Sequence, residues 1–144
     1  MYQQTRGRRR SAQLVYFVAF ALVGTTPSYG AECWIASNMK GYSAVSNQNY
    51  EFITNGFSQP LYVCFTEDGG TVTGNDVRLV KFGESTLAGY GGNDQGNEVF
   101  VTYQIDRERH KLLFTLSRIG TKTIAPILPD IVEAFVGDAV PTSQ

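Results

Sequence analysis

The sequence contains few of the residues on which most catalytic and metal sites depend. The chain of 144 residues has one histidine, His110, and two cysteines. A Ser-His-Asp site needs a histidine base that a buried carboxylate orients, but His110 lies in a charged run, 107–111, which is typical of a solvated turn. Metal sites need several converging ligands. We therefore predict no catalytic residue, no metal and no cofactor from the sequence.

The chain also lacks an excess of basic residues. Its 12 lysines and arginines face 13 acidic residues, and the formal charge is −1. This balance argues against nucleic acid as a partner. Hydrophobic residues make up 42% of the chain, which excludes a disordered chain, and the length favours one domain.

The segment 1–30 differs from the rest and has the features of a secretory signal peptide. Its first ten residues include four arginines and no acidic residue, an apolar stretch follows over 14–24, and the segment ends in small residues. The stretch is shorter than the about 20 residues of a transmembrane helix. We expect cleavage before Ala31 and export to the periplasm or beyond. No membrane span is expected after cleavage.

Cleavage would change the charge of the protein. Without the arginines at positions 6, 8, 9 and 10, 8 basic residues remain against 13 acidic ones. The exported domain, expected over 31–139 with a frayed tail over 140–144, would then carry a charge of about −5. Such a charge would attract a cationic partner, although it is also ordinary for a solvated protein.

The two cysteines, Cys33 and Cys64, both follow the proposed signal peptide. Two cysteines in an oxidising compartment most simply pair with each other. Their bridge would close a loop of about 30 residues and stabilise the fold by roughly 3–4 kcal/mol. It would tie a loose N-terminus to an internal strand.

The part of the chain after the proposed signal peptide is typical of short strands separated by turns. Asn55-Gly56 is a strong signal for a tight turn, and it follows the first expected strand. The glycine-rich segment 91–97 is the longest expected loop. Strands are predicted at 50–54, 61–65, 71–73, 77–82 and 85–90.

The clearest pattern is an antiparallel hairpin around the polar segment 106–110. Strand side chains alternate between two faces. The predicted core face carries Val99, Val101, Tyr103 and Ile105 on the first strand, and Leu112, Phe114 and Leu116 on the second.

Near the C-terminus the apolar spacing changes from the period of a strand to that of a helix. Ile131, Val132, Phe135 and Val136 follow this spacing, with Pro129 before them and Gly137 after them. We predict a mainly β fold. It is a small antiparallel barrel or sandwich of six to eight short strands with one short C-terminal helix. An open α+β sheet covered by the helix is the alternative.

Two groups of side chains are candidates for ligand binding. The first is aromatic, and its members combine apolar area with a polar edge: Trp34, Tyr42, Tyr50, Tyr62 and Tyr90. The second is basic: Arg78, Lys81, Arg118 and Lys122. Arg118 has the parity of the core face, so it could hold a carboxylate of a ligand or of a neighbour. The alternatives are that the aromatics fill the core and that the basic residues are exposed strand ends. The chosen ligand-binding candidates are Arg118, Tyr90, Arg78, Lys81 and Trp34.

A short segment resembles a known family. Tyr62-Val63-Cys64 followed by Gly69-Gly70 is similar to the Tyr-x-Cys strand and turn of small bacterial periplasmic inhibitors of C-type lysozyme. The resemblance implies an exported β-barrel with a disulfide. The inhibitory loop pattern of that family, Ser-Gly-x-x-Tyr, is absent, because Gly89 directly precedes Tyr90. No inhibitory residue is therefore transferred to this chain.

These features favour an exported, noncatalytic binding module of the bacterial cell envelope. Its partner would be a small molecule, a glycan or an envelope protein. One alternative is a periplasmic protein like the lysozyme inhibitors. Another is a hydrolase that relies on carboxylates alone and needs an acid with a raised pKa in a cleft. A structural envelope protein that acts by packing with others is a further hypothesis.

Overall fold

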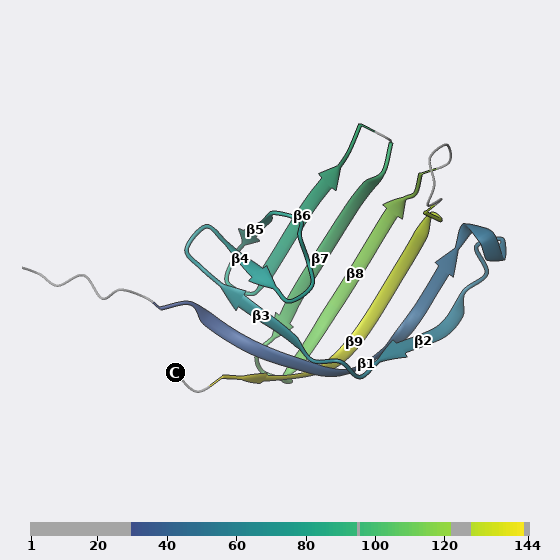
Figure 1. Cartoon of the computed structure of the whole chain (residues 1–144). Helices are drawn as coiled ribbons and strands as arrows, with labels where there is room; N and C mark the ends of the chain where they lie inside the picture. The colour runs from purple at the N-terminus through teal and green to yellow at the C-terminus, as the bar shows by residue number, and fades with distance from the viewer. Residues whose placement is uncertain (1–29, 95, 122–127, 143–144) are drawn as a thin grey trace, which may run out of the picture.

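The computed structural model describes residues 30–94, 96–121 and 128–142, and these residues form one antiparallel sheet closed into a barrel (Figure 1). The closed ring contains eight strands, since β1 pairs with β9. The predicted mainly β barrel is confirmed. The elements in chain order are β1 (Glu32–Val45), η1 (Ser46–Gln48), β2 (Ile53–Phe57), β3 (Leu61–Phe65), β4 (Gly69–Val72), β5 (Leu79–Phe82), β6 (Thr86–Gly92), β7 (Glu98–Asp106), β8 (Lys111–Ile119) and β9 (Ile131–Pro141).

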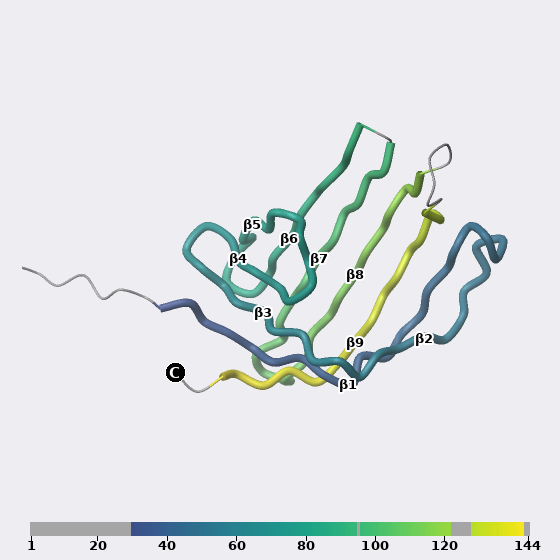
Figure 2. The backbone as a smooth tube through the Cα atoms, in the orientation of Figure 1, coloured from purple at the N-terminus to yellow at the C-terminus, as the bar shows by residue number. Residues whose placement is uncertain are grey.

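Strand β1 organises the closure, because it pairs with three other strands. One edge of β1 pairs with β9, and the other pairs first with β3 and then with β2. Strands β2 and β3 therefore follow one another along the same edge of β1, as Figure 2 shows. The register of β1 against β9 shifts between Ser37 and Lys40, and Asn38 there has a positive φ of 53°. A bulge of this kind bends a strand and increases its twist.

The interior of the barrel is filled by side chains from all around the ring. Val101, Tyr103 and Ile105 of β7 are buried together with Leu112 and Phe114 of β8, and Leu116 packs against this core. The predicted core face is therefore confirmed except at Val99, which is only partly buried. Burial raises the pKa of Tyr103 to about 12. Small barrels commonly fill their interior in this way. The filled core therefore serves stability, and the outer wall is the candidate surface for a ligand.

The predicted C-terminal helix is wrong, because the segment forms strand β9. Apolar residues occupy both faces of β9: Phe135 points into the core, and Val132, Val136 and Val140 are exposed on the outer face. This arrangement hides the alternation in the sequence. A helix of about two turns is marginal in isolation, whereas β9 pairs along both edges with β8 and β1.

Three other expectations change. Asn55-Gly56 lies inside β2, where it pairs with β1, and the chain reverses instead through η1. The tail expected to fray from 140 remains paired through Pro141, opposite Trp34. Strand β1 replaces the expected loose N-terminus.

The proposed signal peptide lies almost wholly outside the described residues. Across the described ranges, no helix is long and apolar enough to cross a membrane.

Candidate functional site

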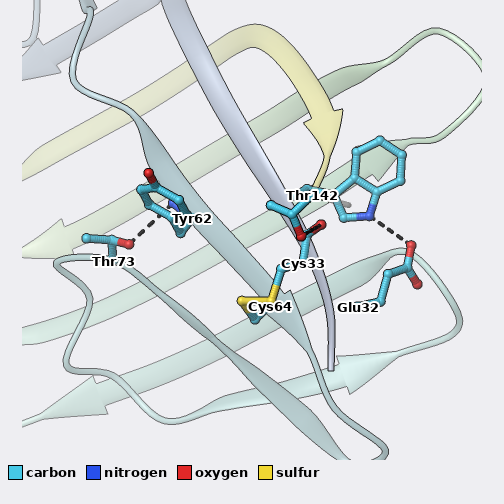
Figure 3. The surroundings of a disulfide bond; sticks show 7 residues. Glu32, Cys33, Tyr62, Cys64, Thr73 and Thr142 are labelled. Carbon is cyan, nitrogen blue, oxygen red and sulfur yellow. Dashed lines mark hydrogen bonds between the residues drawn. A yellow bond between two sulfur atoms is a disulfide. The ribbon is translucent and has the colours of Figure 1, made fainter. Parts of the chain in front are cut away.

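The predicted bridge between Cys33 and Cys64 is confirmed. The two cysteines face each other across β1 and β3 and form a disulfide (Figure 3). Thr142 lies beside Cys33, and its backbone N–H donates to the Cys33 carbonyl at 2.9 Å. The hydroxyl of Thr142 donates to the same oxygen at 3.0 Å. The start of β1, the strand β3 and the end of β9 are therefore held together at this point.

Trp34 and Lys81 have structural surroundings that account for them without a ligand. Trp34 is 5% exposed and lies in the core. Its indole Nε1 donates to Glu32 at 2.8 Å, and its ring lies nearly perpendicular to that of His110 at a centroid distance of 6.0 Å. Lys81 lies 3.7 Å from Glu84, which gives it a local acidic neighbour. The lone histidine thus contacts the core tryptophan, although its turn is solvated as predicted.

The other aromatic candidates lie outside the core. Tyr42, Tyr50, Tyr62 and Tyr90 are all about half exposed or more, at 49–63%. Four exposed tyrosines indicate a binding surface, because aromatic side chains with a polar edge are enriched at such surfaces. They make the outer wall the part of the barrel with the strongest signs of a partner.

Two of these tyrosines border a groove on the outer wall over β6–β9. The register places Tyr90, Phe100, Ser117 and Val132 in one row across the four strands. Adjacent strands lie about 4.8 Å apart, so Phe100 and Val132 are about 10 Å apart on either side of Ser117. Tyr90 is 63% exposed and Phe100 49%. The small serine leaves a depression of about 290 Å³, also lined by Tyr50, Glu98 and Ile119.

A strained loop brings Tyr50 to this groove. Asn49 and Tyr50 both have positive φ angles, 54° and 59°. This conformation is rare for a bulky residue and is often found at functional sites. The Tyr50 hydroxyl donates to Asp130 at 2.6 Å, and Asp130 also accepts the Gly120 N–H at 2.8 Å. The hydrogen bond to Asp130 is the main reason that the pKa of Tyr50 is raised.

Arg118 lines the groove, but its side chain belongs to the inner face. It alternates with the buried face of β8, as its predicted parity requires. Its Nη2 donates to the Pro129 carbonyl at 3.3 Å. Glu133 has the inward parity of Phe135 on β9. Burial raises the pKa of Glu133, and the positive charge of Arg118 partly opposes that rise.

A second hollow adjoins the first on the outer wall. It is lined by Arg78, Val80 and Phe82 and shares Tyr90 and Phe100 with the groove. Tyr90 and Phe100 therefore form a ridge between two hollows. The structure thus brings Tyr90, Arg78 and Arg118 to these two adjoining hollows, while Trp34 and Lys81 line neither of them.

Sequence reasoning missed several residues of the groove. Glu98 and Phe100 alternate with the predicted core face of their strand, so the sequence places them on its outer face, but alternation alone does not mark them as binding residues. Tyr50 belongs to the predicted aromatic group, but no local pattern links it to Asp130, which lies 80 positions away. Lys122 lies outside the described residues.

The fold and its bridge define the chain as a disulfide-linked antiparallel β-barrel protein. Comparison with known protein families, curated proteins and solved structures finds no match. The resemblance to the lysozyme inhibitors rests on Tyr62–Cys64 and Gly69-Gly70, which lie in the paired strands β3 and β4. A function of that kind stays a prediction.

Proposed function

We propose that this chain is an exported, noncatalytic binding module that holds its partner on the outer wall of the barrel. The observation that carries the proposal is the groove bordered by Tyr50, Tyr90 and Phe100, all about half exposed or more. Exposed apolar side chains that gather around a hollow mark interaction sites on soluble proteins. Tyr90 and Phe100 lie on β6 and β7, in the broad part of the sheet in Figure 1, and Tyr50 reaches the same hollow from the loop after η1.

Two further features support this reading. The interior is occupied by large side chains such as Met39, Leu87 and Phe135, so the wall offers more room for a partner than the centre. The disulfide between Cys33 and Cys64 is typical of oxidising compartments such as the periplasm. Together with the signal-like segment 1–30, it supports export.

The proposal is tested by purifying the disulfide-bonded protein from the envelope of cells that produce it. Native mass spectrometry of the wild type should detect a bound species. The double variant Tyr90→Ser/Phe100→Ser should lose that species. Tyr62→Ser is the matched control, because Tyr62 is 49% exposed beside the disulfide and away from the groove. A wild type without any bound species, or equal loss in the control, would contradict the proposal.

A second candidate, a hydrolase that relies on carboxylates, is favoured by one observation. Glu133 is partly buried on the inner face, and burial raises its pKa. In the register its direct neighbours are Leu116 and Ser43, whereas glycoside hydrolysis needs a second carboxyl about 5–10 Å away. Turnover of glycan substrates by the wild type that disappears in Glu133→Gln would favour this candidate over the binding module.

A further inference from the structure

We infer that the outer groove receives the cationic side chain of a lysine or arginine presented by a basic partner protein. The inference rests on the proposed binding function and names the chemistry of the partner. It is carried by the aromatic side chains that border the groove, by the acidic residues at its end, and by the apolar wall around it.

The aromatic side chains provide the surfaces that a cation prefers. Tyr50, Tyr90 and Phe100 border the same hollow from three directions: the loop after η1, β6 and β7. A cation within about 6 Å of such a ring is attracted by the negative charge of its face. The Tyr50 hydroxyl donates to the carboxylate of Asp130 at 2.6 Å. That bond increases the electron density of the Tyr50 ring, which strengthens its attraction for a cation.

The charges at the groove favour a cation over an anion. Glu98 and Asp130 lie at its end, and Glu98 is exposed. Among the described residues, no lysine or arginine forms a salt bridge with Glu98. Arg118 is the positive residue in the lining, but it has the inward parity and its charge acts on Glu133. An anion in the groove would be repelled by the exposed carboxylate of Glu98, whereas a cation would be attracted by it.

The size of the groove and its surroundings favour a side chain of a protein. Its volume of about 290 Å³ is at the lower limit of the roughly 300–1,000 Å³ of small-molecule sites. Around it, Ile119, Val132 and Phe82 are 45–60% exposed on the same wall. A partner that inserts one cationic side chain can cover these apolar residues as well. Central anchors surrounded by apolar contacts are the usual arrangement of protein interfaces.

The test uses a short peptide with one central lysine and the same peptide with that lysine acetylated. Binding to the disulfide-bonded protein is followed by amide chemical shifts in NMR. The lysine peptide should shift the amides of Glu98, Phe100 and Ile119. It should bind about ten-fold more tightly than the acetylated peptide. Its affinity should fall as salt is raised from about 20 to 200 mM, because the attraction is screened.

Two variants with matched controls assign the effect to the groove. Glu98→Gln should weaken the lysine peptide about three-fold or more and leave the acetylated peptide unchanged. Glu108→Gln is its control, since Glu108 lies in the turn at the opposite end of β7. Tyr90→Leu should weaken the lysine peptide by a similar factor, and Tyr62→Leu should not. Unchanged amide spectra away from the substitution confirm that each variant is folded.

The results separate this inference from the proposed function. Equal binding of the two peptides at the groove overturns the cation site and leaves the binding module standing. Absence of any shift at the groove with the lysine peptide also overturns the cation site. Choline bound more tightly than the peptide would overturn the protein partner in favour of a small ammonium compound. If native mass spectrometry finds no species bound to wild type purified from the envelope, the proposed binding function itself is contradicted.

Discussion

We expect the disulfide between Cys33 and Cys64 to contribute strongly to the stability of this protein. The perturbation is the double substitution Cys33→Ala/Cys64→Ala, which opens a loop between residues 31 positions apart. In the chain-entropy model, a loop of this length stabilises the fold by about 3.5 kcal/mol at 25 °C. The neighbours Trp34 and Val63 point into the core, so the cysteines lie on the outer wall. Their truncation leaves the core packing intact.

Urea unfolding followed by tryptophan fluorescence measures this loss. Trp34 is the single tryptophan of the chain and lies next to Cys33. The double variant should lose about 3–4 kcal/mol of the free energy of unfolding. The urea midpoint should fall by about 2–3 M for a typical dependence on urea. The slope against urea should rise, because an unbridged unfolded chain exposes more surface.

Two comparisons make the result decisive. The wild type with a reduced disulfide should unfold like the double variant, because both lack the same constraint. A loss below about 1 kcal/mol would refute the reasoning, since it would mean that the bridge hardly restricts the unfolded chain. A loss well above 5 kcal/mol would also contradict it, because the folded strands themselves would then depend on the bridge.

Further predictions concern the core, the barrel seam and pH. Leu87→Ala truncates a side chain that is 0% exposed and should lower the free energy of unfolding by about 2–5 kcal/mol in urea; a loss below 1 kcal/mol would contradict the packing. Gly41→Ala places a β-carbon against the Ala134 backbone across β1 and β9 and should cost about 3 kcal/mol or more. Gly91→Ala meets side chains only and should cost less in the same assay. The pKa of Glu133 is raised above its ordinary 4.5 in the folded state. Its favourable contribution to the free energy of unfolding is therefore complete below pH 4.5 and is lost as the pH rises through the raised pKa. Glu133→Gln should therefore raise the thermal midpoint at pH 7 and have little effect near about pH 3.5; equal effects at both pH values would contradict the assignment.

The hairpin of β7 and β8 was predictable because its strands are neighbours in the sequence. The disulfide was predictable because the chain has only two cysteines. Val101, Tyr103 and Ile105 alternate with polar residues around a short turn, and the pairing of this hairpin needs no distant partner. The two cysteines allow one intramolecular bridge. Charge and composition likewise depend on the residues alone.

Strands β1 and β9 were not predictable in the same way. They pair with each other although about 90 residues separate them, and this pairing closes the barrel. In β9, Val132 and Val136 on the outer wall break the alternation that identifies a strand. The asparagine and glycine at 55–56 favour a turn locally, but their pairing with β1 keeps them in β2.

The residues of the candidate groove were likewise only partly predictable from local sequence patterns. Tyr90 and Arg118 were chosen by residue type and parity, and both line it. Their neighbours were not evident, because the row from Tyr90 to Val132 exists only through the registers of four paired strands. Tyr50 reaches the row through a loop held by Asp130, 80 positions away.

The amino-acid sequence by itself determined the β character, the single disulfide and the acidic balance after position 30. Alternation, cysteine count and charge are properties of residues and their near neighbours. The tertiary structure decided that the C-terminal segment is a strand, that Trp34 belongs to the core, and that Tyr50, Tyr90 and Phe100 meet on the outer wall. Strand register between distant segments sets which side chains become neighbours, and a shift of one residue reverses every face.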